Sequence, residues 1–379
     1  MIYYSQAAAA YLRYLHGLNA RTADAAAPTR AALALLLAGD ERGAGEALHA
    51  RLAEYDSDAA ASGALGFIAY RRRERDAALR LLERAVELDP GNAEHLALLA
   101  ACQLALARHA QAIAAFRAAL RIDPGLHAAH TLMWSAIAGA GRLDEALLAL
   151  KTALRDEPAS EPAAARVRVE ATTLCLIDCV NHELAVRALR RCTAGCDFDE
   201  VKWLTDRRAA VPGVQTVPIR TLRSAEDYSR FVLKELLQYV DTDYVLLAQW
   251  DGYIVNPQAW SPEFLLFDYI GARWEGAQAY DVGNGGFSLR SRALLQALQD
   301  PAIEPAHPED AAICRSYRRY LEERHGIVFA PGAIAERFSF EHVEPAALPF
   351  GFHGVTNLAR FAAVPRLAAL DCFFDGAAL

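Results

Sequence analysis

The sequence predicts two structural classes in one chain, an α-helical solenoid followed by an α/β domain with a mostly parallel sheet. Residues 59–160 repeat one pattern with a period of 34. From residue 167 onward, apolar β-branched runs alternate with stretches of helical spacing. The 379 residues, 54% hydrophobic and 23% charged, exclude a disordered or fibrous chain and leave room for roughly two or three domains.

The repeat is defined by prolines and small residues in one register. Pro90, Pro124 and Pro158 stand 34 residues apart, and each follows an acidic residue. Small and large apolar positions recur at the same spacing: Ala78, Ala112 and Ala146; Leu82, Phe116 and Leu150; Ala85, Ala119 and Ala153. Small residues let paired helices approach closely, and proline ends the second helix. This pattern resembles the tetratricopeptide repeat. We expect three repeats over 59–160, and N-terminal helices with a degenerate repeat (31–58) over 1–58.

The first helices of such repeats usually line a concave face that holds a peptide. Here the predicted face is small and apolar: Phe67, Tyr70, Ala97, Ala101, Leu104, Thr131 and Ser135. Two interpretations stay open at this point. The face binds a peptide, or it only docks the neighbouring domain.

After a linker rich in Pro, Ala and acid (156–165), the pattern changes to that of an α/β domain over 165–379. Strands are expected within 167–178, 200–204, 213–219 and 244–255, and helices within 181–192 and 224–240. In such sheets ligands bind at the carboxyl ends of the strands. Neither G-x-G-x-x-G nor a P-loop lysine motif occurs, which argues against dinucleotide and NTP-hydrolysing sites of the usual kinds.

The net charge of −8 is uneven along the chain. Residues 1–160 hold 17 Lys and Arg against 18 Asp and Glu, whereas residues 161–379 hold 22 against 29, a net charge of −7. An acidic domain without a basic run is a poor binder of nucleic acid. No stretch approaches the about 18 apolar residues of a membrane span, and the start lacks the pattern of a signal peptide. A cytoplasmic protein is the default expectation.

Two segments of the second domain have residues suited to a substrate site. The apolar run 244–248 ends in Gln249, Trp250, Asp251 and Gly252. A strand-end carboxylate followed by glycine suits a divalent cation that holds phosphate oxygens, although alone it also fits an ordinary turn. Asn284, Gly285 and Gly286 then precede a short strand and a helix, and their backbone could approach a ligand closely or form only a tight turn.

Two later segments add possible acid–base and metal-binding groups. Pro308, Glu309 and Asp310 begin a helix, where acids act either as caps or, as we consider here, as a general base for a hydroxyl. His353 stands between glycines on an expected strand, where it is either structural or a metal ligand.

Together these segments resemble a bacterial family of glycosyltransferase-like domains, over residues 168–358. The hallmarks of that family are QWDG, GNGGFSLRS, HPED and FGFHG, which stand here at 249–252, 283–291, 307–310 and 350–354. Their order is also similar to that of inverting GT-A enzymes such as the beta-galactosyltransferases, which have a Rossmann-like, mostly parallel sheet.

The resemblance implies a role for each segment. Asp251 matches the last acid of the D-x-D motif, and His353 the metal-binding histidine. The cofactor would be a divalent cation, Mn²⁺ or Mg²⁺. Gln249 replaces the first acid of that motif, so one anionic contact to the cation is missing. Asp310 would be the catalytic base, with Glu309 as acceptor contact or substitute base. The donor, a UDP-linked sugar, would contact 249–252 and 284–286.

The expected function is therefore transfer of a sugar from a nucleotide-sugar donor to a hydroxyl acceptor, with inversion. We expect the repeats to present a protein or peptide acceptor. Two alternatives stay open: a small glycan or metabolite as acceptor, and a non-catalytic repeat scaffold with a sugar-binding domain.

Overall fold

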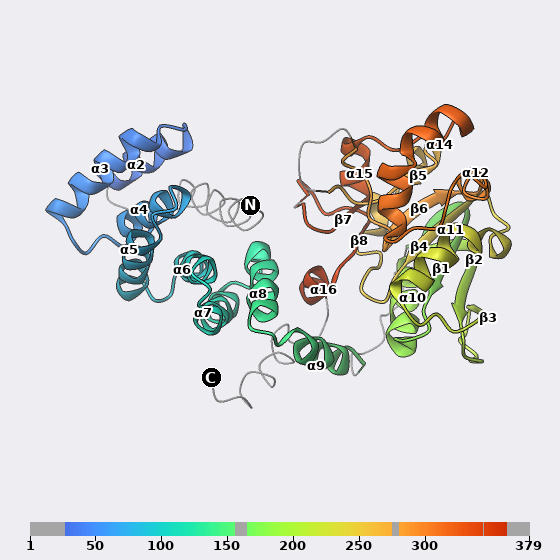
Figure 1. Ribbon diagram of the computed structural model, residues 1–379. Coiled ribbons are helices and arrows are strands. Elements are labelled where there is room, and N and C mark those ends of the chain that lie inside the picture. Colours follow the sequence, from blue (N-terminus) through green and yellow to red (C-terminus); the bar gives the residue numbers. More distant parts are fainter. Residues whose placement is uncertain (1–26, 156–164, 275–279, 344, 362–379) are drawn as a thin grey trace. The chain divides into compact units, whose positions relative to one another are not determined.

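The computed structural model describes residues 27–155, 165–274, 280–343 and 345–361 (Figure 1). The chain divides into two compact units between Ala153 and Leu154. The sequence analysis placed the end of the repeats at 160 and the start of the second domain at 165, close to this division.

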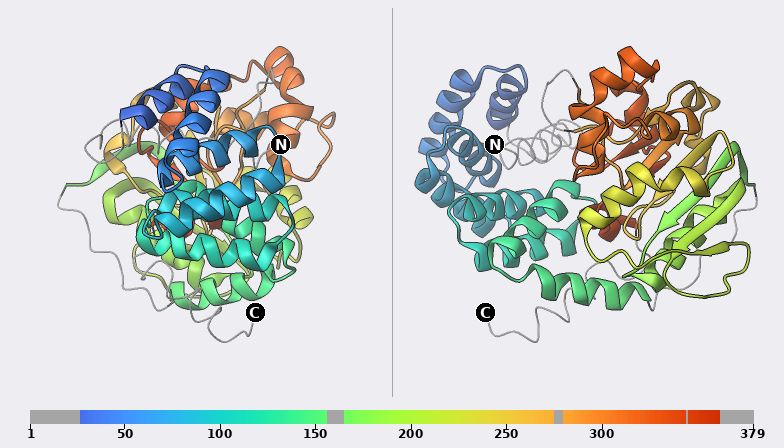
Figure 2. Two further views of the ribbon diagram at one scale, coloured as in Figure 1. Left: turned by 90° about the vertical axis from the view of Figure 1, so that its left-hand side faces the viewer. Right: turned by 45° about the vertical axis from the view of Figure 1, so that its right-hand side comes forward.

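The first unit consists of helices that pair in sequence order. Three pairs lie at the three predicted repeats: α4 (Ala59–Arg71) with α5 (Arg75–Leu88), α6 (Ala93–Ala105) with α7 (His109–Ile122), and α8 (His127–Gly139) with α9 (Leu143–Arg155). A preceding pair, α2 (Ala27–Leu37) and α3 (Glu41–Glu54), covers the degenerate repeat. The views of Figure 2 show the pairs following one another along this unit.

One turn position shows that all four helix pairs are built alike. Gly39, Arg73, Ala107 and Gly141 follow one another at the repeat spacing of 34, and each has a positive φ, of 86°, 63°, 56° and 71°. Each lies between the first and second helix of its pair. Only glycine adopts this left-handed conformation without strain. The pair α2/α3 therefore shares the geometry of the repeats, although its sequence lacks the terminal proline.

The predicted concave face of the repeats is partly buried. Phe67, Tyr70, Ala97 and Ala101 are 1%, 2%, 6% and 2% exposed, whereas Leu104, Thr131 and Ser135 are half-buried. Both interpretations of this face, peptide binding and docking of the neighbouring domain, stay predictions.

The second unit is built on a six-stranded mixed sheet with the order β3-β2-β1-β4-β6-β5. Its strands are β1 (Val167–Ile177), β2 (Cys196–Thr205), β3 (Gln215–Pro218), β4 (Tyr244–Ala248), β5 (Tyr269–Ile270) and β6 (Phe287–Ser291). The first four are mutually parallel, but β6 runs antiparallel to both β4 and β5. The expectation of a mostly parallel sheet was therefore wrong for one side of the sheet. The described part of the chain between β4 and β6 contains no long helix, whereas a parallel pair needs a long crossover connection.

Helices and short turns surround this sheet. The helices are α10 (His182–Gly195), α11 (Ala225–Lys234), α12 (Arg292–Ala297), α13 (Glu309–Ala311), α14 (Arg318–His325), α15 (Gly332–Phe338) and α16 (Val355–Phe361). Single turns η1 (Leu236–Tyr239), η2 (Pro257–Ala259) and η3 (Pro262–Leu266) are 3₁₀, and η4 (Ala312–Ser316) is π-helical. A small parallel pair, β7 (Ser339–Phe340) and β8 (Gly351–Phe352), lies outside the main sheet.

The main core of this unit lies on one face of the sheet. Cys175 and Ile177 of β1 pack there with residues of α11, α12, η4 and α14. Because side chains alternate along a strand, Leu174 and Leu176 face the opposite side, where α10 contacts β1 and β2. Both faces are thus covered, and functional side chains are left to the edges of the sheet. Within the described ranges, no helix has the length and apolar character needed to cross a bilayer.

Candidate functional site

The end of β4 brings Gln249 to the carboxyl edge of the sheet. The backbone N–H of Gly252 donates to the Gln249 carbonyl at 3.1 Å and closes a turn there. A Cβ on Gly252 would lie 2.8 Å from the Phe352 carbonyl oxygen, so the turn packs against β8 only because this residue is glycine. Within the turn, Trp250 is half-buried and Asp251 is 8% exposed.

The Asn-Gly-Gly segment before β6 lets two polar side chains approach its backbone. Asn284 has a φ of 61°, in the left-handed region that asparagine tolerates better than most residues. A Cβ on Gly285 would lie 2.1 Å from Glu309 Oε1, and one on Gly286 would lie 2.0 Å from His353 Nε2. Neither position can hold a side chain without displacing these groups. The glycines predicted from sequence are therefore required by close packing within the site.

The two acids of the HPED segment have different environments. Glu309 Oε1 pairs with Nη2 of the fully buried Arg290 at 3.1 Å. Asp310 accepts hydrogen bonds from the backbone N–H groups of Gly285, at 3.0 Å, and Ala311, at 2.7 Å. Burial and the neighbouring Glu309 carboxylate raise the pKa of Asp310, and these effects outweigh the two hydrogen bonds and Arg290, which lower it. A carboxylate with a raised pKa is a better proton acceptor than an ordinary one.

His353 follows β8 and lies between two carboxylates. Its Nδ1 is 3.1 Å from Glu341 Oε1, and its Nε2 is 3.2 Å from Gln249 Oε1 and 3.4 Å from Asp251 Oδ1. Asn284 Nδ2 donates to Glu341 at 2.5 Å. Burial lowers the pKa of His353, but the Asp251 and Glu341 carboxylates raise it more, so that the pKa lies well above its usual value.

These groups line one cavity of about 380 Å³. Its described lining consists of Gln249, Trp274, Asn284, Gly285, Gly286, Pro308, Glu309, Asp310, Ala311, Arg315, Glu341 and His353. Seven of the predicted residues thus lie together: Gln249, Asn284, Gly285, Gly286, Glu309, Asp310 and His353. Three others, Trp250, Asp251 and Gly252, do not line the cavity, although Asp251 contacts His353.

Four residues of the site were not predicted from the sequence. Glu341 contacts His353, Arg290 pairs with Glu309, and Arg315 and Trp274 line the cavity. Arg290 stands in FSLRS, where apolar and polar residues alternate as in an ordinary half-buried strand, so the sequence does not signal its burial. The other three also stand in segments without such a signal.

The donor atoms around His353 can be compared with the ligands that the expected divalent cation needs. No group of three or more His, Cys, Asp and Glu side chains is placed to hold a metal ion in the described part of the chain. However, His353 Nε2, Asp251 Oδ1 and the neutral Gln249 Oε1 converge at 3.2–3.4 Å. Ligands of a six-coordinate Mg²⁺ lie about 3 Å apart, and such ions take much of their shell from water and phosphate. These residues fit a divalent cation held mainly by a phosphate ligand. A proton on Nε2 would have to leave first.

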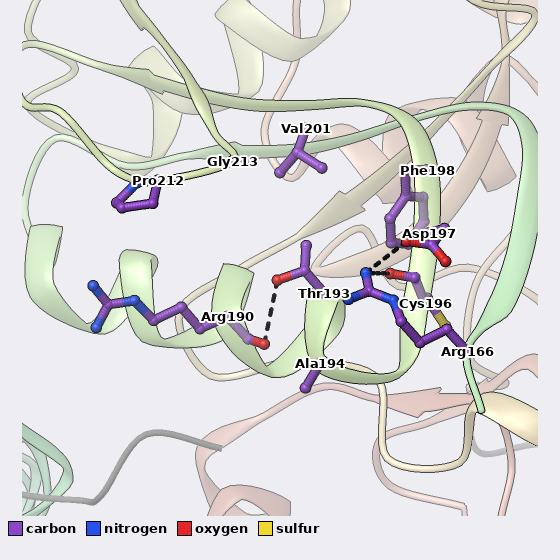
Figure 3. Close-up of a pocket in the computed structure, with 10 residues that line it drawn as sticks. All are labelled: Arg166, Arg190, Thr193, Ala194, Cys196, Asp197, Phe198, Val201, Pro212 and Gly213. Carbon is purple, nitrogen blue, oxygen red and sulfur yellow. Dashed lines mark hydrogen bonds and ion pairs between the residues drawn. The ribbon is translucent and has the colours of Figure 1, made fainter. Parts of the chain in front are cut away.

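A second cavity, of about 450 Å³, lies at the amino edge of the parallel strands (Figure 3). Arg166 pairs with Asp197 at 2.7 Å and donates to the Cys196 carbonyl at 2.8 Å. Thr193 Oγ1 donates back to its own helix, at the Arg190 carbonyl. No predicted site residue lines this cavity in the described part of the chain. The smaller cavity at the opposite edge is therefore the candidate site, because the predicted polar groups converge there.

Comparisons with known proteins agree with part of this picture. Residues 69–138 match the tetratricopeptide repeat, which confirms the repeats. Residues 212–353 match a family described only as a protein of unknown function (DUF5672). That match spans the QWDG, Gly-rich and HPED segments and ends at His353. No curated protein matches the chain.

Two solved structures are similar to parts of the chain. One is a crystal structure of MamA, with 25% identity over 36% of this chain and 81% of that chain, and a TM-score of 0.31. The other is a mutant O-GlcNAc transferase of Thermobaculum terrenum, with 17% identity, a TM-score of 0.29, and coverage of 59% of this chain and 45% of that one. Both TM-scores are low, so neither likeness establishes a shared fold.

Proposed function

We propose that the second unit is a GT-A-like glycosyltransferase that moves a sugar from a nucleotide-sugar donor to a hydroxyl acceptor with inversion. One observation carries the proposal. Four segments far apart in sequence bring the Asp310 carboxylate, which we assign as the base, and the Asp251–His353 pair, which we assign to the cation, to the same place at the carboxyl edge of the sheet. A reaction that deprotonates a hydroxyl while a diphosphate departs needs both.

Asp310 is the base in this proposal. Its carboxylate takes the proton of the acceptor hydroxyl while the hydroxyl oxygen attacks the anomeric carbon. The bond from that carbon to the diphosphate oxygen breaks, and the diphosphate leaves with the electron pair. Two backbone N–H groups, of Gly285 and Ala311, hold the carboxylate in place. Glu309 is less suited to this role because Arg290 already pairs with it.

The donor would lie along the strand-end and Gly-rich segments. Gln249, Asn284, Gly285 and Gly286 line the cavity and would contact the sugar and diphosphate, whereas Trp250 and Gly252 would shape the turn behind Gln249. Asp251 and His353 would hold a divalent cation, which neutralises negative charge on the leaving diphosphate when bound. Their mixed carboxylate and imidazole donors favour Mn²⁺ over Mg²⁺. A UDP-linked sugar is the donor we would test first.

The acceptor has two candidates. The first is a protein or peptide held by the repeats, whose predicted face keeps Leu104, Thr131 and Ser135 half-buried. The second is a small glycan or metabolite whose hydroxyl enters the cavity beside Asp310. Deleting the repeats would distinguish the two, because only a repeat-bound acceptor would lose transfer selectively.

The first experiment measures binding and slow hydrolysis of a panel of nucleotide sugars, with Mn²⁺, Mg²⁺ or EDTA. We expect one donor class to bind and to be hydrolysed. Asp310→Asn should abolish hydrolysis while binding persists, because it removes the base and leaves the cavity's shape intact. Asp251→Ala should weaken Mn²⁺-dependent binding.

Asp243→Asn is the matched control. Asp243 is exposed and does not line the cavity, so its variant should behave like the wild type. Full activity of a folded Asp310→Asn protein would refute the catalytic role. The absence of binding to every donor would favour the non-catalytic scaffold instead.

A further inference from the structure

Two of the three carboxylates in the described lining of the candidate cavity are paired with a cation. Glu309 pairs with Arg290, and Glu341 pairs with His353. Arg315 is the remaining cation of the described lining, and none of the described carboxylates forms an ion pair with it. A negatively charged ligand in this acidic cavity needs a cation nearby, because the carboxylates repel it.

A π-helical turn brings Arg315 into the cavity. The backbone N–H of Tyr317 donates to the Ala312 carbonyl at 2.8 Å, five residues back, as in a π-helix. In a regular α-helix, the five residues from Asp310 to Arg315 would turn the two side chains about 140° apart around the axis. With the π turn between them, both side chains line the same cavity. Such turns occur often at functional sites.

The Arg315 guanidinium lies over the ring of Trp274. The guanidinium carbon lies 4.0 Å from the centre of the indole ring. Trp274 is itself held: its backbone N–H donates to the Asp281 carbonyl at 2.7 Å, and its ring packs against Gly283 so closely that a Cβ there would lie 2.1 Å from it. A stacked guanidinium keeps its N–H edge free for a second partner, and that edge matches phosphate oxygens.

We propose that Arg315, held on Trp274, binds the diphosphate of the donor and so makes donor binding partly independent of a divalent cation. The inference rests on the proposed function and adds a specific phosphate-binding residue to it. It also accounts for Gln249, since a site with a fixed arginine needs one fewer anionic ligand for a cation. Arg315 would stabilise the charge that grows on the leaving diphosphate.

Equilibrium binding of UDP, uridine and inorganic pyrophosphate tests this inference by calorimetry, in EDTA and in Mn²⁺. Another nucleoside diphosphate replaces UDP if the donor panel selects one. In EDTA, Arg315→Gln should weaken binding of UDP and pyrophosphate by about 10- to 100-fold, the usual value of a charge-assisted pair. Uridine binding should not change. With Mn²⁺ the loss should be smaller, because the cation shares the diphosphate charge.

Three further variants separate binding from structure. Arg315→Lys should keep part of the affinity, and Trp274→Leu should lose part of it, because the guanidinium is no longer held. Arg319→Gln, the same change at an exposed position outside the cavity lining, should bind like the wild type. Equal binding of diphosphate by the wild type and Arg315→Gln would overturn the inference and leave the proposed function standing. Failure of the wild type to bind any nucleoside diphosphate or pyrophosphate would overturn both.

Discussion

Replacing Arg290 by methionine would test whether its ion pair with Glu309 is a main stabilising contact of the site. The Arg290 and Glu309 side chains are 0% and 7% exposed, and the paired atoms are 3.1 Å apart. Methionine removes the cation but leaves the Glu309 carboxylate buried. Breaking such a buried pair typically costs about 3–5 kcal/mol of unfolding free energy. This is a large share of the roughly 5–15 kcal/mol that holds a domain together.

Unfolding in guanidinium chloride, followed by tryptophan fluorescence, is the suitable assay. Four of the five tryptophans belong to the second unit, so the signal reports mainly on its unfolding. Arg290→Met should lower the midpoint strongly, and Arg290→Met with Glu309→Gln should recover part of the loss because no buried charge remains.

The exposed pair Arg319–Glu323, with side chains 78% and 64% exposed, provides the control, and Arg319→Met should change the midpoint little. If Arg290→Met lost no more stability than Arg319→Met, or if the double variant lost the sum of the two single changes, the reasoning would be refuted.

Three other predictions concern the pKa of Asp310, a turn between two repeat helices and a buried histidine. Glu309→Gln removes an anion that raises the pKa of Asp310, so the acid limb of the transfer rate against pH should move to lower pH. Ala107 has a positive φ, so Ala107→Gly should raise the unfolding free energy by about 1 kcal/mol. The control Ala114→Gly, inside α7, should lower it by about as much. Unfolding followed by the helical circular dichroism signal measures both. Burial lowers the pKa of His95 from 6.5 to about 4, so the unfolded chain binds more protons between these values and stability falls as pH falls through this window. The unfolding free energy should fall by about 2 kcal/mol at pH 5. Hydrogen exchange in α4 and α6, corrected for the intrinsic exchange rate, should become faster accordingly. His95→Leu should remove this pH dependence.

The sequence predicted the repeats well because their signal is local and recurs. The 34-residue spacing places each helix pair, and even α2/α3 follows it, as the positive φ at Gly39 shows. Strand direction cannot be predicted in this way, because the alternation of apolar residues is the same in parallel and antiparallel strands. Tyr244–Ala248 is apolar and Phe287–Ser291 alternates apolar and polar residues, but neither pattern gives a direction, and only the path between them makes the pair antiparallel. The mixed sheet could therefore not be inferred from strand composition.

The residues of the candidate site likewise fall into two groups, those that short local segments predicted and those that they did not. Asn284, Gly285, Asp310 and His353 belong to short segments whose composition is unusual within each segment, and all four line one cavity. Arg315 lies in the cavity because of a π-helical turn, which no residue type in the sequence predicts. Glu341 reaches it beside the pairing of β7 with β8, and Trp274 reaches it through its backbone hydrogen bond to Asp281, and neither contact can be inferred from local composition.

The net charge of the second half of the chain differs from the local charge balance at the candidate site. A net charge of −7 over residues 161–379 predicts that a phosphate-bearing ligand needs a cation supplied to it. In the structure, however, Arg290 offsets Glu309, and His353 lies between Asp251 and Glu341. Local pairing thus removes most of the repulsion that the total charge implies. Whether the cavity binds an anion then depends on whether one cation is free of such pairing. Binding of diphosphate in EDTA tests this directly, whereas the net charge does not.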